Sequence, residues 1–296
     1  MDIRRILVIY KKSVYELYAL ESEDPSFLAY LEQEEEARER IINAHHDNLD
    51  AIESVCSALE AAGVEYECDH RARKRSLSGF DAVVTIGGDG TLLDASHAIR
   101  DVPVLGVNSS PSFSVGHYCT THAPGFPDVL SDVLSGRIEL VELQRIRVQI
   151  GAKAIPHPVL NEILFAHRRP AATARFRIEL DGRSDEIKSS GVWVATPTGS
   201  TGAIGSAGGD WVHHEDPSMQ YLMREVYADP GNADAIRRGH TSGPIRLVSR
   251  TRRGAIFVDG HRLKYNVGYG IPVTLDLDAP PLRLFHTHFA EQRKAR

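Results

Sequence analysis

The stretch Thr85-Ile86-Gly87-Gly88-Asp89-Gly90-Thr91 decides the fold of this chain, because three glycines join an apolar strand to a helix there. We expect the strand at residues 82–86 and the helix from about Thr91. Glycines at such a junction let the backbone turn sharply and bring its N–H groups against a phosphate. A carboxylate would repel a bare phosphate, so Asp89 is expected to act on a hydroxyl or a metal ion. The loop therefore points to phosphoryl transfer.

The same loop also has a purely structural interpretation. It suits a tight strand-to-helix turn in which Asp89 lies near a helix N-terminus, where the helix dipole favours negative charge. Glycine loops are common, so the spacing alone does not decide between the two interpretations.

Length and composition bound the class of protein. The 296 residues suffice for one large or two moderate domains, and 42% hydrophobic with 25% charged residues is typical of a soluble globular protein. The formal net charge of −6 argues against a general nucleic-acid binder, and no apolar stretch is long enough to span a bilayer. The three cysteines lack CxxC spacing, which predicts free thiols in a cytoplasmic protein.

The first part of the chain alternates between strand and helix patterns. Apolar runs predict strands at residues 6–10, 64–68, 82–86 and 102–107, and residues 25–62 predict helix in one or two pieces. This alternation predicts a parallel sheet with crossover helices. Ligands of such sheets bind beyond the carboxyl ends of the strands, which is where the glycine loop lies.

After about Thr121 the pattern changes to strands with weak helix signals, which predicts a mainly antiparallel β domain. Strands are expected at residues 145–150, 159–165, 175–180, 246–249, 255–259 and 272–275. Residues 229–243 are expected to form a loop or a poorly ordered insert. Histidine pairs at positions 45–46, 213–214 and 286 with 288 lack a third ligand at suitable spacing, so no metal site built from protein ligands is expected.

Three further polar segments are candidates for chemistry. Asn161 and Glu162 are neighbours within an apolar strand, and neighbours in a strand face opposite sides. Either one of them faces water, or the strand is bulged or ends there and both reach a ligand. Residues 195–203 combine hydroxyls and glycines after an apolar strand, which suits either ribose and phosphate oxygens or a surface turn. Asp259-Gly260 suits a type I′ hairpin turn.

Taken together and in this order, the four segments resemble the NAD kinase family, which carries GGDGT, an asparagine–glutamate pair, a TPTGST-like stretch and a late Asp-Gly. The similarity runs from about Ile3 to Phe285. Residues 106–111, 115–119 and 219–225 resemble a divergent branch that includes NADH kinases and mitochondrial-type NAD kinases.

The chain also departs from the typical bacterial pattern of that family. Ser110 stands in for a glycine, His117 falls near the family's phenylalanine, and Ser190 replaces an aspartate. The loss of a carboxylate at Ser190 suggests the hypothesis that discrimination between cationic NAD⁺ and neutral NADH is relaxed.

The resemblance implies a fold and a division of the chain. We expect an α/β, Rossmann-like N-terminal domain with a parallel sheet at residues 1–123, which carries the glycine loop. A mainly antiparallel β domain that binds nucleotide is expected at residues 124–275. A C-terminal segment, residues 276–296, is expected to return to the first domain.

The resemblance further implies a reaction, in which the ATP γ-phosphoryl group is transferred to the 2′-hydroxyl of the adenosine ribose of NAD⁺ or NADH, giving NADP(H). Asp89 is the implied base, and Mg²⁺ is expected to bind through the substrate phosphates. The implied partners are small-molecule nucleotides, with no nucleic acid and no membrane, and the implied assembly is a homo-oligomer, a dimer or higher. The implied nucleotide-binding residues are Gly87, Gly88, Gly90, Thr91, Asn108, His117, Asn161, Glu162, Ser190, Thr198, Thr201, Ser206 and Asp259.

Two other functions remain open from the sequence. A lipid kinase shares the glycine motif, but it gives no reason for the hydroxyl-rich run at residues 195–203. A non-catalytic NAD(P)-binding sensor is compatible with the departures at Ser110, His117 and Ser190. ATP turnover that depends on NAD(H) separates both from a dinucleotide kinase.

Overall fold

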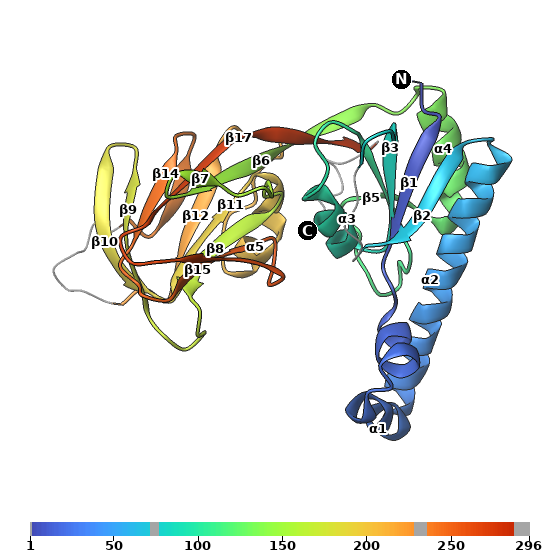
Figure 1. The fold of residues 1–296 in the computed structure, drawn as a ribbon, viewed down its shortest axis with the longest axis horizontal. Helices are drawn as coiled ribbons and strands as arrows, with labels where there is room; N and C mark the ends of the chain where they lie inside the picture. The colour runs from blue at the N-terminus through green and yellow to red at the C-terminus, as the bar shows by residue number, and fades with distance from the viewer. Residues whose placement is uncertain (1, 72–76, 228–235, 287–296) are drawn as a thin grey trace. The chain divides into compact units, whose positions relative to one another are not determined.

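The computed structural model describes residues 2–71, 77–227 and 236–286 (Figure 1). The chain forms two compact units, of which the first comprises Met1–Glu142 with the segment that begins at Arg283, and the second comprises Leu143–Leu282. The first boundary between the units follows Glu142, which is later in the chain than the expected boundary at 123/124. The second boundary follows Leu282, which is later than the expected boundary at 275/276.

The first unit is an α/β structure. Its elements are β1 (Arg5–Tyr10), the π-helix η1 (Glu16–Glu21), α1 (Pro25–Gln33), α2 (Glu35–Ala61), β2 (Glu65–His70), β3 (Ala82–Ile86), α3 (Asp89–Ser96), β4 (Val104–Asn108), β5 (Cys119–His122), the 3₁₀ helix η2 (Ala123–Gly125) and α4 (Phe126–Leu134). The strands pair in parallel in the order β2–β1–β3–β4, and β5 also pairs with β4 in parallel. Helices α2 and α4 lie on one side of this sheet and α3 lies on the other (Figure 1).

Burial explains why these residues form a covered parallel sheet. All five residues of β3 and all five of β4 are buried, as expected for strands with helices on both faces. In α2, Ala51, Val55 and Leu59 recur every four residues and pack into the core of the sheet. Gly63 follows α2 with a φ of +66°, a conformation that glycine adopts readily at a helix end.

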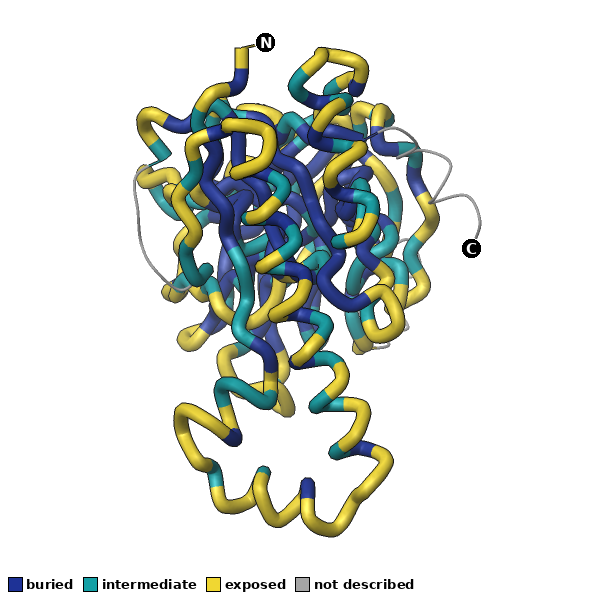
Figure 2. The backbone as a smooth tube through the Cα atoms, turned by 90° about the vertical axis from the view of Figure 1, so that its right-hand side faces the viewer, coloured by how far each residue is buried: buried dark blue, intermediate teal, exposed yellow. Residues whose placement is uncertain are grey.

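Helix α1 starts at a strong local signal. The Asp24 carboxylate accepts hydrogen bonds from the N–H groups of Ser26 and Phe27, and Pro25 occupies the first helical position. Figure 2 shows that the backbone from η1 through the first turns of α2 is mostly exposed. Large apolar side chains are among the exposed ones in η1 and α1, namely Tyr18, Leu20, Leu28 and Tyr30.

The second unit is built from antiparallel strands. Its elements are β7 (Lys153–Ala154), β8 (Glu162–His167), β9 (Ala174–Leu180), β10 (Arg183–Ser189), β11 (Gly191–Ala195), the 3₁₀ helix η3 (Thr198–Thr201), α5 (Ala203–Ser206), β12 (Met219–Arg224), β13 (Arg238–Thr241), β14 (Ile245–Ser249), β15 (Gly254–Val258) and β16 (Leu263–Val267). One antiparallel sheet has the order β13–β12–β11–β8–β15–β16. A second antiparallel set has the order β10–β9–β14–β17.

Two long strands belong partly to each unit. β6 (Leu140–Ile150) begins in the first unit, and β17 (Pro272–Phe285) ends in it. Near the end of β17, Leu284 pairs in parallel with Val104 of β4.

The core of the second unit consists of the alternating apolar residues that the sequence pattern places inward. Phe176, Ile178 and Leu180 of β9 are buried, and Phe165 of β8 meets Phe176 edge to face with ring centroids 5.2 Å apart. The parallel sheet of the first unit and the antiparallel sheets of the second confirm the predicted fold class.

Some local predictions were wrong. Within residues 229–243, expected to be a loop, β13 is a strand because it pairs with β12, while residues 228–235 lie outside the described part of the chain. Asp259-Gly260 does lie in a hairpin, but Val258 pairs with Leu263, so the connection has four residues rather than the two of a type I′ turn. No described helix has the length and hydropathy needed to cross a membrane.

Candidate active site

The glycine loop joins β3 to α3 with little room for side chains. Gly87 has a φ of +152°, and a Cβ at this position would lie 2.2 Å from Thr91 Oγ1. A Cβ at Gly88 would lie 2.2 Å from Ser114 Oγ. Helix α3 begins at Asp89, two residues before the expected Thr91, so that Asp89 occupies its first turn. Close packing and backbone conformation therefore require glycine at position 87, whereas a Cβ at position 88 would displace the Ser114 side chain.

Asp89 is held at one oxygen. Its Oδ1 accepts a hydrogen bond from the Tyr118 N–H at 2.8 Å, and its Oδ2 has no hydrogen bond to any residue that the structure describes. The side chain is half-buried. Burial, reinforced by the Asp89 carboxylate, raises the pKa of the neighbouring Cys119 thiol. The result is an oriented carboxylate with one oxygen available to a ligand.

Asn108 organises the loop that contains Tyr118, whose N–H donates to Asp89. Asn108 ends β4 and is buried, its Nδ2 donates to Ser114 O at 2.9 Å, and its Oδ1 accepts from Ser110 N–H at 3.2 Å. A cavity of about 330 Å³ beside it is lined in part by Asn108, Gly116 and Cys119. His117 is half-buried in the same loop. The two hydrogen bonds of Asn108 engage its amide within the loop, so that this residue shapes the wall of the cavity.

Thr91 and Lys11 complete the surroundings of the loop. Thr91 is buried, and its Oγ1 has no hydrogen-bond partner among the described residues. Lys11, which directly follows β1, is a residue that sequence reasoning missed. Burial, and next the nearby Arg71, lower the pKa of Lys11. The available signal was its position, a lysine just after a strand whose carboxyl end lies at the ligand-binding edge of a parallel sheet.

In the second unit, Asp259 fixes the backbone of the asparagine–glutamate pair. Its carboxylate accepts hydrogen bonds from the N–H groups of Leu160 at 2.9 Å, Asn161 at 2.7 Å and Glu162 at 3.1 Å. Strand β8 begins at Glu162, so Asn161 lies just before the strand. The strand therefore has one end at this pair, with Asn161 outside it and Glu162 as its first residue, paired with Ala195.

Glu162 is a buried carboxylic acid whose pKa lies well above its ordinary value. Its side chain is 6% exposed, and its Oε2 accepts a hydrogen bond from Ala203 N–H at 3.2 Å. Burial, and next the charge of Asp259, raise the pKa of Glu162 to about 7, although the Ala203 N–H acts in the opposite direction. Near neutral pH this carboxyl group therefore exists in both its charged and its neutral form.

The hydroxyl-rich run is interior and not a surface turn. Thr196, Thr198 and Ser200 are buried. Thr196 Oγ1 donates to Leu160 O at 2.6 Å, and Ser200 Oγ is bonded to the backbone of Val212. These hydroxyls hold the backbone of the run in place.

The glycines of this run serve close packing against the asparagine–glutamate pair. A Cβ at Gly199 would lie 2.0 Å from Asn161 O, and one at Gly202 would lie 2.4 Å from Glu162 Oε2. The run and the pair therefore form one constellation, which we call the Glu162 cluster: Asn161, Glu162, residues 196–203 and Asp259.

The remaining predicted residues divide between this cluster and a distant position. Thr201 is half-buried at the end of η3, and Ser206 is exposed at the end of α5, where its Oγ donates to Gly202 O at 3.4 Å. Ser190 lies between β10 and β11, with its N–H bonded to Arg224 O. Since Ala195, at the other end of β11, pairs with Glu162, Ser190 is separated from Glu162 by the length of that strand, roughly 17 Å.

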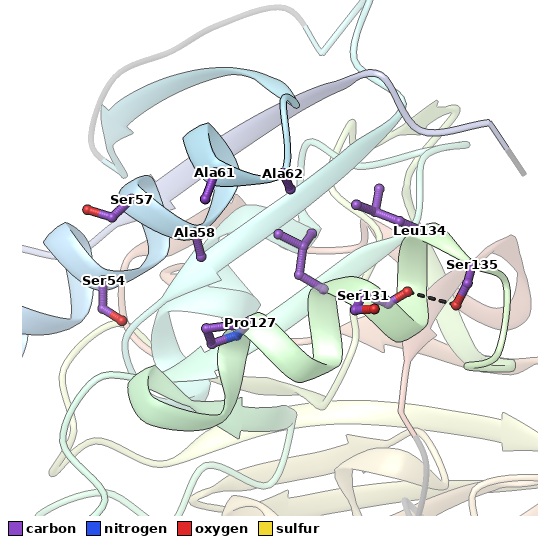
Figure 3. Close-up of a pocket in the computed structure, with 10 residues that line it drawn as sticks. Ser54, Ser57, Ala58, Ala61, Ala62, Pro127, Ser131, Leu134 and Ser135 are labelled. Atoms are coloured by element: carbon purple, nitrogen blue, oxygen red, sulfur yellow. Dashed lines mark hydrogen bonds between the residues drawn. The ribbon is translucent and has the colours of Figure 1, made fainter.

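Two further findings concern sites of other kinds. The described residues contain no group of three or more histidine, cysteine, aspartate and glutamate side chains that would hold a metal ion. A groove of about 810 Å³ lies between α2 and α4, lined mainly by small side chains such as Ser54, Ala58 and Ser131 (Figure 3). None of the predicted site residues lines this groove.

Comparisons with known proteins show which family the chain resembles. Residues 8–138 match the family described as ATP-NAD kinase N-terminal domain. A probable NADH kinase from Oryza sativa subsp. japonica is 30% identical over 88% of this chain and 85% of its own length. An NADH kinase from Arabidopsis thaliana is 31% identical over 74% of this chain and 77% of its own length.

Solved structures share the fold. An NAD kinase from Archaeoglobus fulgidus in complex with ATP aligns with a TM-score of 0.69 and 22% identity, over 98% of this chain and 95% of its own. A yeast NADH kinase complexed with NADH aligns with a TM-score of 0.71 and 17% identity, over 98% of this chain and 85% of its own. The chain belongs to the NAD kinase family.

Proposed function

We propose that this protein is an NAD(H) kinase, which transfers the γ-phosphoryl group of ATP to the 2′-hydroxyl of the adenosine ribose of NAD⁺ or NADH. The observation that carries this proposal is the Asp89 carboxylate, oriented by Tyr118 N–H through one oxygen and free of hydrogen bonds to described residues at the other. Relatives that cover most of the chain are named NADH kinase, which supports the assignment of substrates.

The proposed step uses Asp89 as a general base. The carboxylate accepts the proton of the 2′-hydroxyl while the 2′-oxygen forms a bond to the γ-phosphorus. The bond between that phosphorus and the β,γ-bridging oxygen breaks, and ADP leaves with the electron pair. Asp89 fits this role because its Oδ1 is already satisfied by Tyr118, so that its Oδ2 faces no competing donor among the described residues.

The Glu162 cluster is proposed to hold the acceptor. A carboxylate accepts hydrogen bonds from two ribose hydroxyls, and an amide such as that of Asn161 pairs with an adenine edge. Asp259 holds the backbone of the same residues, because its carboxylate accepts hydrogen bonds from their N–H groups. We therefore propose that Asp259 positions the asparagine–glutamate pair.

The roles of the remaining predicted residues follow from their positions. Gly87, Gly88, Gly90 and Thr91 are proposed to surround the donor phosphates. Asn108 is proposed to act by holding the loop that contains His117, since its amide is bonded within that loop.

In the Glu162 cluster, Thr201 and Ser206 are proposed to add hydroxyl contacts to the nucleotide, and Thr198 to support them from the interior. Ser190 lies a strand length from Glu162, so we propose that it faces the nicotinamide end of the acceptor.

Mg²⁺ is proposed as the metal of the reaction, bound chiefly through the donor phosphates. When bound, it would neutralise charge on the phosphates and on the transferred phosphoryl group. The hard carboxylate oxygen of Asp89 fits such an ion, because it has no hydrogen bond to a described residue.

We also propose a homo-oligomer, a dimer or higher, in the cytoplasm. The exposed apolar side chains of η1 and α1, among them Tyr18, Leu20 and Leu28, support a contact between subunits, since clustered exposed apolar groups are typical of interaction surfaces. The three free cysteines support a reducing compartment. Light scattering across a range of protein concentrations tests the assembly, and a strictly monomeric mass would contradict it.

The experiment that tests the proposed function is a coupled assay for NADP(H) formation, with NAD⁺ or NADH as acceptor and ATP or polyphosphate as donor. We expect product only when a dinucleotide acceptor and a phosphoryl donor are both present. Phosphorylation of a diacylglycerol under the same conditions would support the lipid kinase instead. Binding of NADPH without turnover of any donor would support the sensor.

A further inference from the structure

We propose that Lys11, with Arg71 as a second positive charge nearby, binds the polyphosphate group of the nucleotide that donates the phosphoryl group. This inference rests on the proposed kinase function and extends it to a residue outside the glycine motif. It assigns a role to a lysine that the sequence presents only as the first of two adjacent basic residues, Lys11 and Lys12.

The backbone of Lys11 is fixed beside the glycine loop. Lys11 directly follows β1, its N–H donates to Ile86 O at 3.3 Å, and its carbonyl oxygen accepts from Asn48 Nδ2 at 3.1 Å. Its side-chain stem passes close to the loop, because a Cβ at Gly87 would lie 3.3 Å from Lys11 Cδ. The ammonium group, two bonds beyond Cδ, is therefore held near the phosphate-binding edge of the sheet.

The charge of Lys11 has no acidic partner within residues 2–71, 77–227 and 236–286. Its ammonium forms no ion pair with any residue that the structure describes. Lys12, in contrast, lies within ion-pair distance of both Glu16 and Glu21. A half-buried cation without an acidic partner is costly unless an anion joins it, so Lys11 is suited to a ligand that brings negative charge.

Arg71 adds a second positive charge at the same edge. Its N–H donates to Tyr10 O at 2.9 Å, which places it next to the end of β1, and its guanidinium pairs with Asp94 of α3 at 3.2 Å. Burial of Lys11, and next the charge of Arg71, lower the pKa of the lysine, which agrees with two cations in close proximity. Two neighbouring cations suit a ligand with more than one negative charge.

The ligand is assigned as the donor and not the acceptor, although both nucleotides carry phosphates. Lys11 lies against Gly87, two residues before Asp89, where the transferred phosphorus must approach the hydroxyl that Asp89 deprotonates. The pyrophosphate of the acceptor is attached to the 5′-carbon of its ribose, away from the 2′-hydroxyl. The buried Thr91 hydroxyl, on the same side of Gly87 and without a described partner, adds an unsatisfied polar group to this position.

The test compares Lys11→Met with Lys12→Met. The first removes the charge and keeps a stem of similar length, and the second removes a neighbouring charge that is already paired. Initial rates give kcat and both KM values, and calorimetry gives the Kd for ATP without acceptor. We expect Lys11→Met to raise the Kd and KM for ATP about 10-fold or more and to change the KM for NAD(H) less than about twofold. Lys12→Met is expected to change neither by more than about twofold.

Other results would overturn the proposal. A raised KM for NAD(H) with an unchanged KM for ATP would assign the lysine to the acceptor pyrophosphate. Unchanged ATP affinity in a folded Lys11→Met variant would leave the lysine with a structural role only. Thermal melting and Lys11→Arg, which keeps the charge and should retain most of the ATP affinity, separate misfolding from lost binding. If the wild-type protein lacks kinase activity, the proposed function fails, while the ATP-binding comparison still tests this inference.

Discussion

The glycine loop of the first unit and the Glu162 cluster of the second unit use polar groups in opposite ways. Around the glycine loop, Asp89 Oδ2, Thr91 Oγ1 and the Lys11 ammonium lack hydrogen bonds or ion pairs to described residues. In the Glu162 cluster, Asp259 accepts three backbone hydrogen bonds. The first region leaves these polar groups for a ligand, whereas the second uses the Asp259 carboxylate to hold its own backbone. We infer that the loop carries the chemistry and the cluster positions the acceptor.

Gly87→Ala is expected to disrupt the glycine loop of the first unit, with the largest effect on stability and activity. The new Cβ would lie 2.2 Å from Thr91 Oγ1 and 2.9 Å from Thr91 Cβ, in a backbone conformation with φ of +152° that L-residues rarely adopt. We expect a loss of stability of about 2–3 kcal/mol, in the upper part of the usual range for overpacking, and a fall in kcat of about 10²-fold because Asp89 is displaced. Urea unfolding and initial-rate assays measure both.

Gly90→Ala is the matched control for folding. A Cβ at Gly90 meets no heavy atom within 4 Å, and alanine favours the helix. We expect stability equal to or above that of the wild type. A destabilised Gly90→Ala with an unaffected Gly87→Ala would contradict the described packing of the loop.

Asp259→Ala tests the rigidity of the second region. The change leaves the N–H groups of Leu160, Asn161 and Glu162 without their acceptor, at about 1 kcal/mol each, so we expect a loss of roughly 3 kcal/mol. The KM for NAD(H) should rise about 10-fold while the KM for ATP stays near its wild-type value.

Asp259→Asn is the control, because asparagine keeps one acceptor oxygen and tolerates the φ of +46° found at this position. It should lose less than half as much stability as the alanine variant. Equal losses in both variants would mean that the carboxylate does not hold the asparagine–glutamate backbone.

Glu162→Gln tests the electrostatic strain within the cluster. The folded pKa of about 7 lies above the ordinary 4.5, so ionised Glu162 disfavours the folded state. This cost is absent below about pH 4.5, grows as the pH rises towards 7 and is constant above it. Its upper size is about 3 kcal/mol.

The glutamine variant should therefore be more stable than the wild type at pH 8, and the difference should shrink as the pH falls towards 4.5. Urea unfolding at several pH values measures this. A constant difference between the two proteins across the range would show that Glu162 titrates normally.

Ser190→Asp tests a position distant from the Glu162 cluster and has the smallest expected effect. Ser190 lies one strand length from the residue that pairs with Glu162, so a restored carboxylate would act at long range. We expect the ratio of kcat/KM for NAD⁺ over NADH to rise no more than about threefold, through attraction of the cationic nicotinamide. A lowered ratio would reject Ser190 as the source of relaxed discrimination.

Local pattern predicted much of the fold because alternation and helical spacing report directly on burial. The strands at β3 and β9 and the end of α2 at Gly63 follow from residues close in sequence. β10 was missed because its residues, Arg183–Ser189, are mainly polar and form a strand by pairing with β9. Its strand character depends on tertiary pairing, which local propensity does not encode.

The same limit applies to the candidate site. The motif residues were identifiable, but the role of Asp259 depends on contacts with backbone groups 97 to 99 positions earlier in the chain. Lys11 was missed because a pair of lysines is typical of a solvated surface. Only the structure shows that Lys12 pairs with Glu16 and Glu21, while Lys11 has no ion pair in the part of the chain that the structure describes.

The most direct test of the central claim is a comparison of ligand binding and turnover in Asp89→Asn. Asparagine keeps an oxygen that accepts from Tyr118 N–H, so the loop should retain its conformation. We predict that ATP and NAD(H) bind within about threefold of their wild-type affinities while kcat falls about 10²-fold or more. Wild-type turnover in this variant, with both ligands bound, would contradict the assignment of Asp89 as the base.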